Sequence, residues 1–428
     1  RIFEGIQTWK SAILVSFCLA FWGCRPAPPV AQPARVVSGS MAPNLYGEHW
    51  EVECVDCGNK FRIGVEHPPL KMQAVCPNCG CRENEVDRSD LLPGMPVKIH
   101  RRDFEVQPPQ RWDVVAFHEP GANHAAVKRV VGLPGEKIVI RGGDINVNGK
   151  IARKSYADFA GIGQIVYQAS FHENAREDRW QSATDGSQWK PIDAGTDNWF
   201  ICKPSVQSET DWLKYHHLRG SAFAAQRDAA LQIMDDYTYN QGLARKLNVV
   251  RDVSLEAFVR MDDGGEFCVR ILGGSEPLWI SVLPSQNTVA LYRGEERLAE
   301  APNPTPLAKL SKCLLGVSLV DGRVFVEINR EVALEYTFDS PEELANAETS
   351  LAFGNRGLNV EVLLPVIYRD IYYLNPHGRA DDWEMDAPLG EDEYFLLGDN
   401  APVSIDSRQY GPIKAADMIG SVEPRQED

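Results

Sequence analysis

Short runs of β-branched and other apolar residues recur along the second half of this chain, and they constrain its fold more than any other feature. The runs lie at residues 255–261, 267–272, 278–283, 288–293, 314–320, 324–328 and 360–368. Apolar and polar residues alternate most clearly in 325–329, directly after the turn-forming Asp321-Gly322-Arg323, as in a strand with one buried face. Strands of this length, separated by turns, predict an all-β sandwich.

A second β region lies upstream of these runs. It contains the apolar segments 114–117, 127–131, 137–141 and 145–149. A Gly142-Gly143 pair separates the last two segments and predicts a hairpin. At 428 residues, 43% of them hydrophobic, the chain can form two or three domains with their own cores.

Four cysteines form two Cys-x-x-Cys-Gly motifs, Cys54/Cys57 and Cys76/Cys79. The glycine after each pair permits the positive φ that a tight turn around a metal requires. Two such pairs predict a tetrahedral four-sulfur site of the zinc-ribbon kind, with a structural Zn²⁺. The alternative is redox-active or disulfide-linked pairs, which an oxidising compartment would favour. Cys81 is a fifth nearby thiol that four-coordinate zinc does not need.

The N-terminal segment Ser11–Cys24 is apolar and uncharged, with Lys10 before it and Arg25 after it. Its fourteen residues are fewer than the roughly 20 that cross a bilayer as a helix. Three interpretations remain open: a short transmembrane anchor, a cleaved export signal, and a buried core helix. The prolines in residues 26–33 exclude a helix there and predict an extended spacer.

The net charge of −16 argues against a nucleic-acid partner, because affinity for a phosphate backbone depends on basic clusters. No run of Lys or Arg is longer than two residues. An electrostatic membrane-binding patch is therefore not expected either.

Three motifs occur in a fixed order. They are Ser38-Gly-Ser-Met-Ala-Pro43, then Lys128-Arg-Val-Val-Gly-Leu-Pro-Gly135 after the strand Arg111–Phe117, and finally Gly398-Asp-Asn400 with Ser404-Ile-Asp-Ser-Arg408. Together they resemble the type I signal peptidases, membrane-bound Ser/Lys endopeptidases that remove leader peptides from exported proteins. The last motif departs from the family pattern at residues 401–403. The resemblance implies a signal-peptidase-like β catalytic domain behind an N-terminal membrane helix.

The residues themselves are compatible with lysine as a base, since no histidine lies in a triad-like setting. Lysine serves only when neutral, and at its ordinary pKa of about 10.4 roughly one in 2,500 is deprotonated at pH 7. Desolvation lowers that pKa. On a strand, Ala126, Lys128 and Val130 share one face and Arg129 points to the other. We therefore expect Lys128 to be buried and Arg129 to stay solvated.

By resemblance, Ser40 is the nucleophile and Lys128 the general base. The Ser40 backbone N–H and the Ser38 hydroxyl match the family's oxyanion donors. The remaining matched positions are supporting residues: Ser404 orients the lysine amine, Asp406 and Arg408 form a structural ion pair, and Asp399 lies in the turn that positions the site.

The family pattern stops between about 168 and 372, and this insert contains the predicted sandwich. Its Asp321–Asn329 segment resembles the concanavalin/laminin-G-like jelly rolls, folds that often bind sugars. Fold alone does not establish function. No metal-binding carboxylate cluster is visible in the insert, which favours a ligand-free structural role, with any ligand unknown.

The predicted domain map has six segments. They are a membrane anchor with Pro-rich spacer (1–35), a first catalytic part (36–53), a zinc ribbon (54–81), a second catalytic part (82–167), a β-sandwich insert (168–372) and a third catalytic part (373–428).

The resemblance implies a signal peptidase I in the cell membrane, single- or multi-pass, with its catalytic domain on the extracytoplasmic side. Its partners would be membrane lipid and signal-peptide-bearing preproteins, cut after a small residue without a catalytic cofactor. One alternative is a catalytically idle membrane receptor for glycan or protein. Another, a Ser/Lys self-cleaving regulator, needs a DNA-binding helical domain and an internal cleavage site, and neither is visible.

Overall fold

The computed structural model describes residues 31–425 except 103, 105, 170–178, 184, 192–199, 205–208, 218–231, 304–306, 308–311, 340–343 and 345–348. The predicted membrane segment Ser11–Cys24 lies outside this part of the chain. Within the described residues, no helix is long and apolar enough to cross a membrane. The prediction of a mainly β protein is confirmed, and the α-helices described, α2 (Tyr156–Ile162) and α3 (Ser407–Tyr410), are short.

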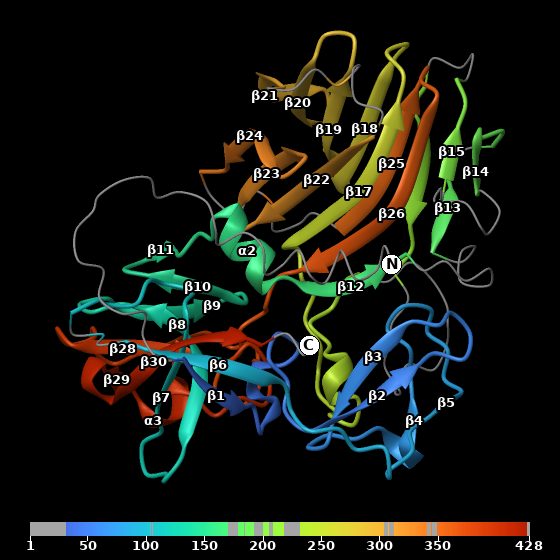
Figure 1. Ribbon diagram of the computed structural model, residues 1–428. Coiled ribbons are helices and arrows are strands. Elements are labelled where there is room, and N and C mark those ends of the chain that lie inside the picture. Colours follow the sequence, from blue (N-terminus) through green and yellow to red (C-terminus); the bar gives the residue numbers. More distant parts are fainter. Residues whose placement is uncertain are drawn as a thin grey trace, which may run out of the picture.

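One antiparallel sheet gathers strands from both ends of the chain (Figure 1). Its order is β1 (Ala31–Arg35), β6 (Pro96–Arg101), β30 (Met418–Pro424), β7 (Val114–His118), β8 (Ala125–Gly132), β28 (Glu393–Leu397) and β29 (Ile413–Lys414). A smaller sheet next to it is ordered β11 (Lys150–Ile151), β10 (Asp144–Val147), β9 (Ile138–Arg141) and β27 (Trp383–Glu384). We call these sheets with their loops the split unit (residues 31–48, 87–163 and 371–425), because two inserts interrupt it.

The first insert, which we call the ribbon (residues 49–86), consists of two hairpins that each carry one cysteine pair. They are β2 (His49–Glu53) with β3 (Lys60–Gly64), and β4 (Gln73–Ala74) with β5 (Asn84–Glu85), joined through the 3-10 turn η3 (Leu70–Met72). The cysteines pack with Val52, Phe61 and Ile63 in a small core of their own.

The second insert is a two-layered sandwich (residues 164–370), at the upper right of Figure 1. Among the described residues, one sheet is ordered β14 (Trp189–Pro191), β15 (Phe200–Cys202), β26 (Val360–Arg369), β17 (Val253–Met261), β22 (Cys313–Val320), β23 (Arg323–Ile328) and β24 (Glu331–Thr337), with β12 (Gln164–Gln168) also pairing with β26. The other is ordered β13 (Trp180–Ser182), β16 (Asp211–Tyr215), β25 (Thr349–Arg356), β18 (Glu266–Leu272), β19 (Leu278–Leu283), β20 (Thr288–Arg293) and β21 (Glu296–Pro302).

Both sheets share one hydrophobic core, because alternate residues of each strand point inward. Val253, Leu255, Ala257 and Val259 of β17 are all buried in it. Each of the seven runs predicted from sequence coincides with a strand to within two residues at either end. Strand β12 begins before the predicted boundary at 168 and belongs to the sandwich sheet.

A buried charge cluster joins the sandwich to the split unit. The Lys154 ammonium contacts the carboxylates of Asp321 at 3.1 Å and Asp370 at 2.8 Å. Carboxylate oxygens of Asp144, Asp252 and Asp321 lie within 4.8 Å of one another. Two carboxylates of the insert thus form a cluster with one of the split unit, which was not expected from the sequence. These residues lie far apart in the sequence, and only the fold brings them together. Burial, with the nearby Asp321 charge, raises the pKa of Asp144 to about 7, and Lys154 supplies the cation inside the cluster.

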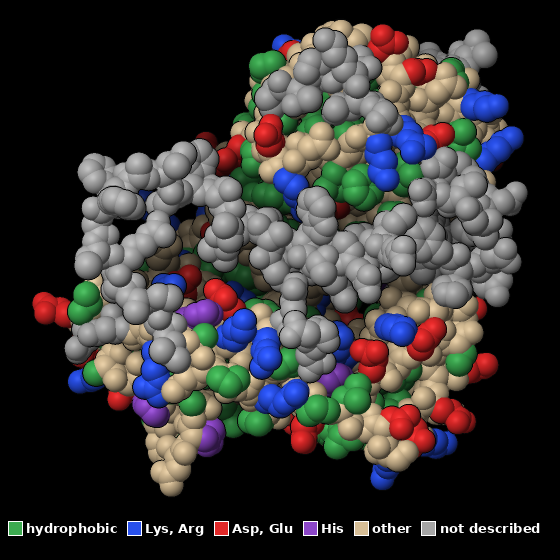
Figure 2. Space-filling model, in the orientation of Figure 1, with side chains coloured by type: hydrophobic (Ala, Val, Ile, Leu, Met, Phe, Trp, Pro, Cys, Tyr) green, Lys and Arg blue, Asp and Glu red, His purple; other side chains and the backbone are tan. Residues whose placement is uncertain are grey.

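Lys and Arg side chains are interspersed with Asp and Glu on the face shown in Figure 2. Over its described residues, this face presents no large basic surface of the kind that phosphate backbones require.

Candidate active site

The Lys128 amine donates a hydrogen bond of 2.6 Å to the hydroxyl of Ser40. Lys128 lies on β8, and Ser40 lies in the 3-10 turn η2 (Gly39–Met41). The two residues are 88 positions apart in the chain. A hydroxyl and an amine at this distance can exchange a proton directly.

Lys128 is buried, as expected from its sequence, and so is every residue of β8 that follows it. Its side chain shares a face with Val130, and β7 pairs beside it through Val115. Lys128 is only 5% exposed. Burial lowers its pKa to about 8, although the charges of Asp406 and Glu119 act in the opposite direction. With such a pKa, about one molecule in ten carries the neutral amine at pH 7.

The hydroxyl of Ser38 lies 3.3 Å from that of Ser40 and donates to it. Ser38 is exposed, so its hydroxyl can turn toward an incoming carbonyl. From the opposite side, the Glu66 carboxylate accepts a 2.9 Å bond from the Gly39 N–H. Glu66 lies in the ribbon, and no motif in the sequence indicates this contact.

The Gly398–Asn400 turn lies directly behind the serine. The backbone N–H of Asn400 donates to the Ser40 carbonyl at 3.0 Å, and its side-chain amide donates to the Gly39 carbonyl at 2.8 Å. A Cβ at position 398 would lie 2.5 Å from the Ser40 carbonyl oxygen and 2.2 Å from the Ser404 hydroxyl. Only glycine fits there without moving the backbone of η2, the turn that contains Ser40.

Arg129 is buried, so the expectation that it stays solvated is wrong. It is 5% exposed, and its guanidinium forms a two-pronged pair with Asp399 at 2.8 and 2.5 Å. It also donates to the Trp112 carbonyl at 2.7 Å. The second face of β8 packs inside the split unit rather than facing solvent, and the bidentate pair compensates the buried charge.

The remaining predicted site residues lie together behind Lys128. Asp406 and Arg408 form a buried two-pronged ion pair with both distances at 2.7 Å. The Asp406 carboxylate also accepts from the Gly398 N–H at 3.1 Å. The Ser404 hydroxyl, expected to hold the lysine amine, has no hydrogen-bond partner among the described residues. It packs against Gly398, and the amine bonds Ser40 instead.

The four ribbon cysteines converge on one point. Their sulfurs all lie within 4.8 Å of one another, with Cys54 and Cys79 3.5 Å apart and Cys57 and Cys76 3.6 Å apart. Zinc–sulfur bonds of 2.3 Å in a tetrahedron require sulfur separations of about 3.8 Å. All cysteines in the described part of the chain are free of disulfide bonds. This set could therefore hold Zn²⁺.

The backbone conformation around the sulfurs is compatible with a four-sulfur metal site. Gly58 and Gly80 have the positive φ values expected from the motif, 63° and 75°. The Cys81 N–H donates to the Cys79 sulfur at 3.5 Å, so the fifth cysteine contributes through its backbone. Buried Asn84 donates to the carbonyls of Ala74 and Cys81 and ties the second hairpin together.

Comparison with known families matches residues 6–188 and 355–425 to the family described as "Signal peptidase, peptidase S26", which is more than half of the chain. A signal peptidase I from Leptolyngbya laminosa is 30% identical over 83 residues, 17% of this chain and 41% of that relative. The chain thus spans less than half the length of this relative.

Solved lectin-like structures resemble the sandwich weakly. The metal-free carbohydrate recognition domain of Emp46p covers 44% of this chain and 88% of its own, at 11% identity and a TM-score of 0.29. The carbohydrate-binding module CBM66 from Bacillus subtilis covers 45% and 92%, at 10% identity and a TM-score of 0.26. The jelly-roll identity and any sugar ligand of the insert therefore stay predictions.

Proposed function

The chain belongs to the signal peptidase family, peptidase S26, and from that membership we propose that it is a membrane-anchored signal peptidase I. It cleaves leader peptides from exported preproteins with Ser40 as nucleophile and Lys128 as general base. One observation carries the proposal: the 2.6 Å contact between a buried amine and a serine hydroxyl. The Ser11–Cys24 segment anchors the chain, and the site works on the extracytoplasmic side of the cell membrane.

The reaction begins when the Ser40 Oγ attacks the scissile carbonyl carbon and its proton passes to the neutral Lys128 Nζ. The developing oxyanion accepts hydrogen bonds from the Ser40 N–H and the Ser38 hydroxyl. The C–N bond then breaks, and Lys128 returns the proton to the leaving amine. In the second half, Lys128 takes a proton from a water that attacks the acyl–serine ester. The ester bond to Ser40 Oγ then breaks, Lys128 returns the proton to Oγ, and the cleaved chain leaves with a free carboxyl end.

The buried ion pairs keep this geometry in place. Arg129 with Asp399 fixes the turn behind the serine, and Asp406 with Arg408 fixes the Gly398 backbone. Their charges are paired before substrate arrives, so little reorganisation is needed in the transition state.

We further propose a structural Zn²⁺ held by Cys54, Cys57, Cys76 and Cys79. The metal would stabilise the small ribbon core, and it takes no part in peptide cleavage. The ribbon in turn supplies Glu66 to η2, the turn that contains Ser40.

The test is cleavage of a radiolabelled preprotein by the full-length chain reconstituted in lipid vesicles. Replacing either Ser40 or Lys128 with alanine should lower the cleavage rate by at least about a thousandfold, because the two residues act as a unit. Matched controls are Ser89→Ala and Lys150→Ala, which alter exposed residues and should leave the rate unchanged. Unchanged cleavage in the Ser40→Ala variant would refute Ser40 as the nucleophile, and no cleavage by the wild type would favour the idle receptor.

A further inference from the structure

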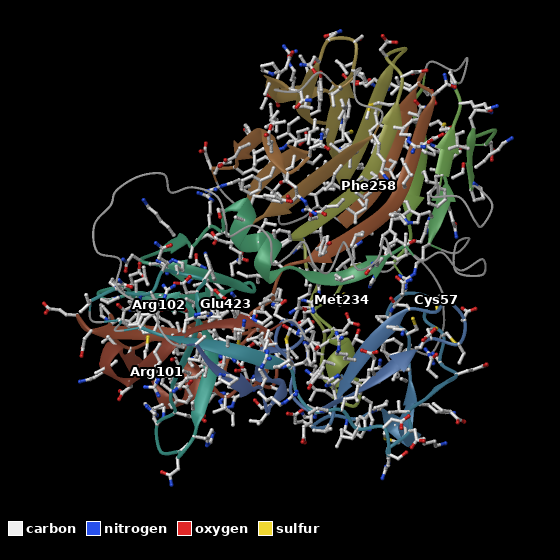
Figure 3. The ribbon with its side chains drawn as sticks, in the orientation of Figure 1. Cys57, Arg101, Arg102, Met234, Phe258 and Glu423 are labelled. Carbon is white, nitrogen blue, oxygen red and sulfur yellow. The ribbon has the colours of Figure 1, made fainter. Side chains whose placement is uncertain are left out.

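A loop of the sandwich insert extends beyond the sandwich and contacts η2 (Gly39–Met41). We call η2 the nucleophile turn, because it contains Ser40. We call residues 235–248 the bridging loop. An isolated bridge between Met234 and Val249 closes its base. Just inside it, the Asp235 N–H donates to the Asn248 carbonyl at 3.0 Å, and the Asn248 N–H donates to the Asp235 carboxylate at 2.8 Å. In Figure 1 the loop runs down from the sandwich beside the ribbon, and Figure 3 labels Met234 at its start.

The tip of the loop is the 3-10 turn η5 (Thr238–Asn240), and its Asn240 forms a reciprocal amide pair with Asn400. Asn240 Nδ2 donates to Asn400 Oδ1 at 2.6 Å, and Asn400 Nδ2 donates to Asn240 Oδ1 at 3.2 Å. The same Asn400 amide donates to the Gly39 carbonyl. Both asparagines are buried, at 6% and 0% exposure. An uninterrupted chain of hydrogen bonds therefore links the insert to the residue before Ser40.

Two tyrosines beside Asn240 hold the tip in place. The Tyr237 hydroxyl donates to the Asp399 carbonyl at 2.7 Å. The Tyr239 ring packs so closely on Gly39 that a Cβ there would lie 2.5 Å from a ring carbon. The nucleophile turn is thus backed by a rigid aromatic surface from the insert.

The bridging loop also forms hydrogen bonds with the ribbon. Gln241 exchanges two hydrogen bonds with the backbone of Val75, at 2.8 and 2.7 Å, next to Cys76. Gly242 donates to the His67 carbonyl at 3.0 Å, adjacent to Glu66. Residues 237–242 of the bridging loop therefore fix the Asn400 turn, the nucleophile turn and the ribbon relative to one another.

We infer that Asn240 is a positioning residue for the peptidase reaction, acting through Asn400 on the backbone around Ser40. The inference rests on the proposed function. The terminal torsion of an asparagine side chain is broad, so without a partner the Asn400 amide is free to rotate away from the Gly39 carbonyl. The reciprocal pair holds it in the one orientation that donates there. Since the Ser40 N–H and hydroxyl both belong to this turn, small displacements lower the rate of acylation.

The test compares Asn240→Ala with the wild-type chain in preprotein cleavage. We expect kcat to fall about 10- to 100-fold, the range for displacing a catalytic group by up to 1 Å, with KM changed less than about twofold because no substrate contact is lost. The Asn240→Ala/Asn400→Ala double variant should be no slower than Asn400→Ala alone, because Asn240 acts through Asn400. A kcat within twofold of wild type, or fully additive losses in the double variant, would overturn the inference.

Asn355→Ala is the matched control. Asn355 is a buried asparagine of the same insert, 3% exposed, whose amide donates to the Leu358 carbonyl and accepts from the Leu358 N–H. This variant should lose similar thermal stability and keep kcat. Should Asn240→Ala not fold, the isosteric Asn240→Asp removes the donation to Asn400 Oδ1, and the same fall in kcat is expected. A wild-type kcat in that variant overturns the inference.

Acylation by p-nitrophenyl acetate separates this inference from the proposed function. Ser40 Oγ bonds the acetyl carbon, its proton passes to Lys128, the aryl ester bond breaks and p-nitrophenolate is released. If p-nitrophenolate release depends on Ser40 but no preprotein is cleaved, the proposed substrate is refuted. The inference about Asn240 is then tested by the rate of p-nitrophenolate release. Asn240→Ala should then slow acylation by the same 10- to 100-fold, and an unchanged acylation rate would overturn the inference.

Discussion

Replacing Lys128 with methionine should remove activity and at the same time stabilise the fold at neutral pH. Burial lowers the pKa of Lys128 from 10.5 to about 8. Between these two values the unfolded chain holds a proton that the folded chain has released, so the stability of the wild type rises with pH across this window. Below pH 8 the full cost of the buried ammonium is present. The pKa values of the unfolded and folded chain differ by about 2.5, and a difference of one in pKa corresponds to about 1.4 kcal/mol. The buried ammonium therefore lowers the free energy of unfolding by about 3 kcal/mol.

The measurement is urea unfolding of the wild type and Lys128→Met at pH 7 and pH 10.5. The stability advantage of the variant should be about 3 kcal/mol larger at pH 7 than at pH 10.5. Packing changes contribute equally at both pH values and cancel in this comparison. Lys150→Met, at an exposed lysine of the same unit, should show no such pH dependence. An advantage for Lys128→Met that is equal at both pH values would refute desolvation as the cause of the lowered pKa.

Three further predictions concern activity, the buried ion pair and the metal. The value of kcat/KM for preprotein cleavage should rise with pH to a plateau above about pH 8, where Lys128 is neutral, and a rise centred near pH 10 would contradict a buried base. Replacing Arg129 with methionine leaves Asp399 buried and unpaired and should cost about 3–5 kcal/mol of unfolding free energy; a loss below 1 kcal/mol in thermal or urea unfolding would show that the pair is dispensable. Elemental analysis should find about one zinc per chain in the wild type and none in Cys57→Ser, and disulfides without metal would exclude the ribbon site.

Local patterns predicted the strands of the sandwich well for identifiable reasons. Strands such as β17 and β22 are buried over most of their length, and their short apolar, β-branched runs are visible in one sequence. Strands β21 and β24 escaped prediction because their residues are mostly polar or half-exposed. Lys128 was predicted to be buried from the alternation of β8, whereas Arg129 was misjudged because alternation reveals the two faces of a strand but not what covers each face.

Contacts between distant segments were outside the reach of sequence patterns. The pair between Asn240 and Asn400 joins residues 160 positions apart, and the Asp144, Asp252 and Asp321 carboxylates come from three separate segments of the chain. Neither has a spacing that a motif could capture.

The amino-acid sequence by itself determined the β character of the chain, the cysteine knuckles and the motifs that contain Ser40 and Lys128, because each depends on residue type and short-range period. Only the tertiary structure decided the surroundings of the dyad: the buried Arg129–Asp399 pair, the unpartnered Ser404 hydroxyl and the insert loop behind Ser40. Such contacts depend on how layers pack and on which polar groups must be satisfied once water is excluded.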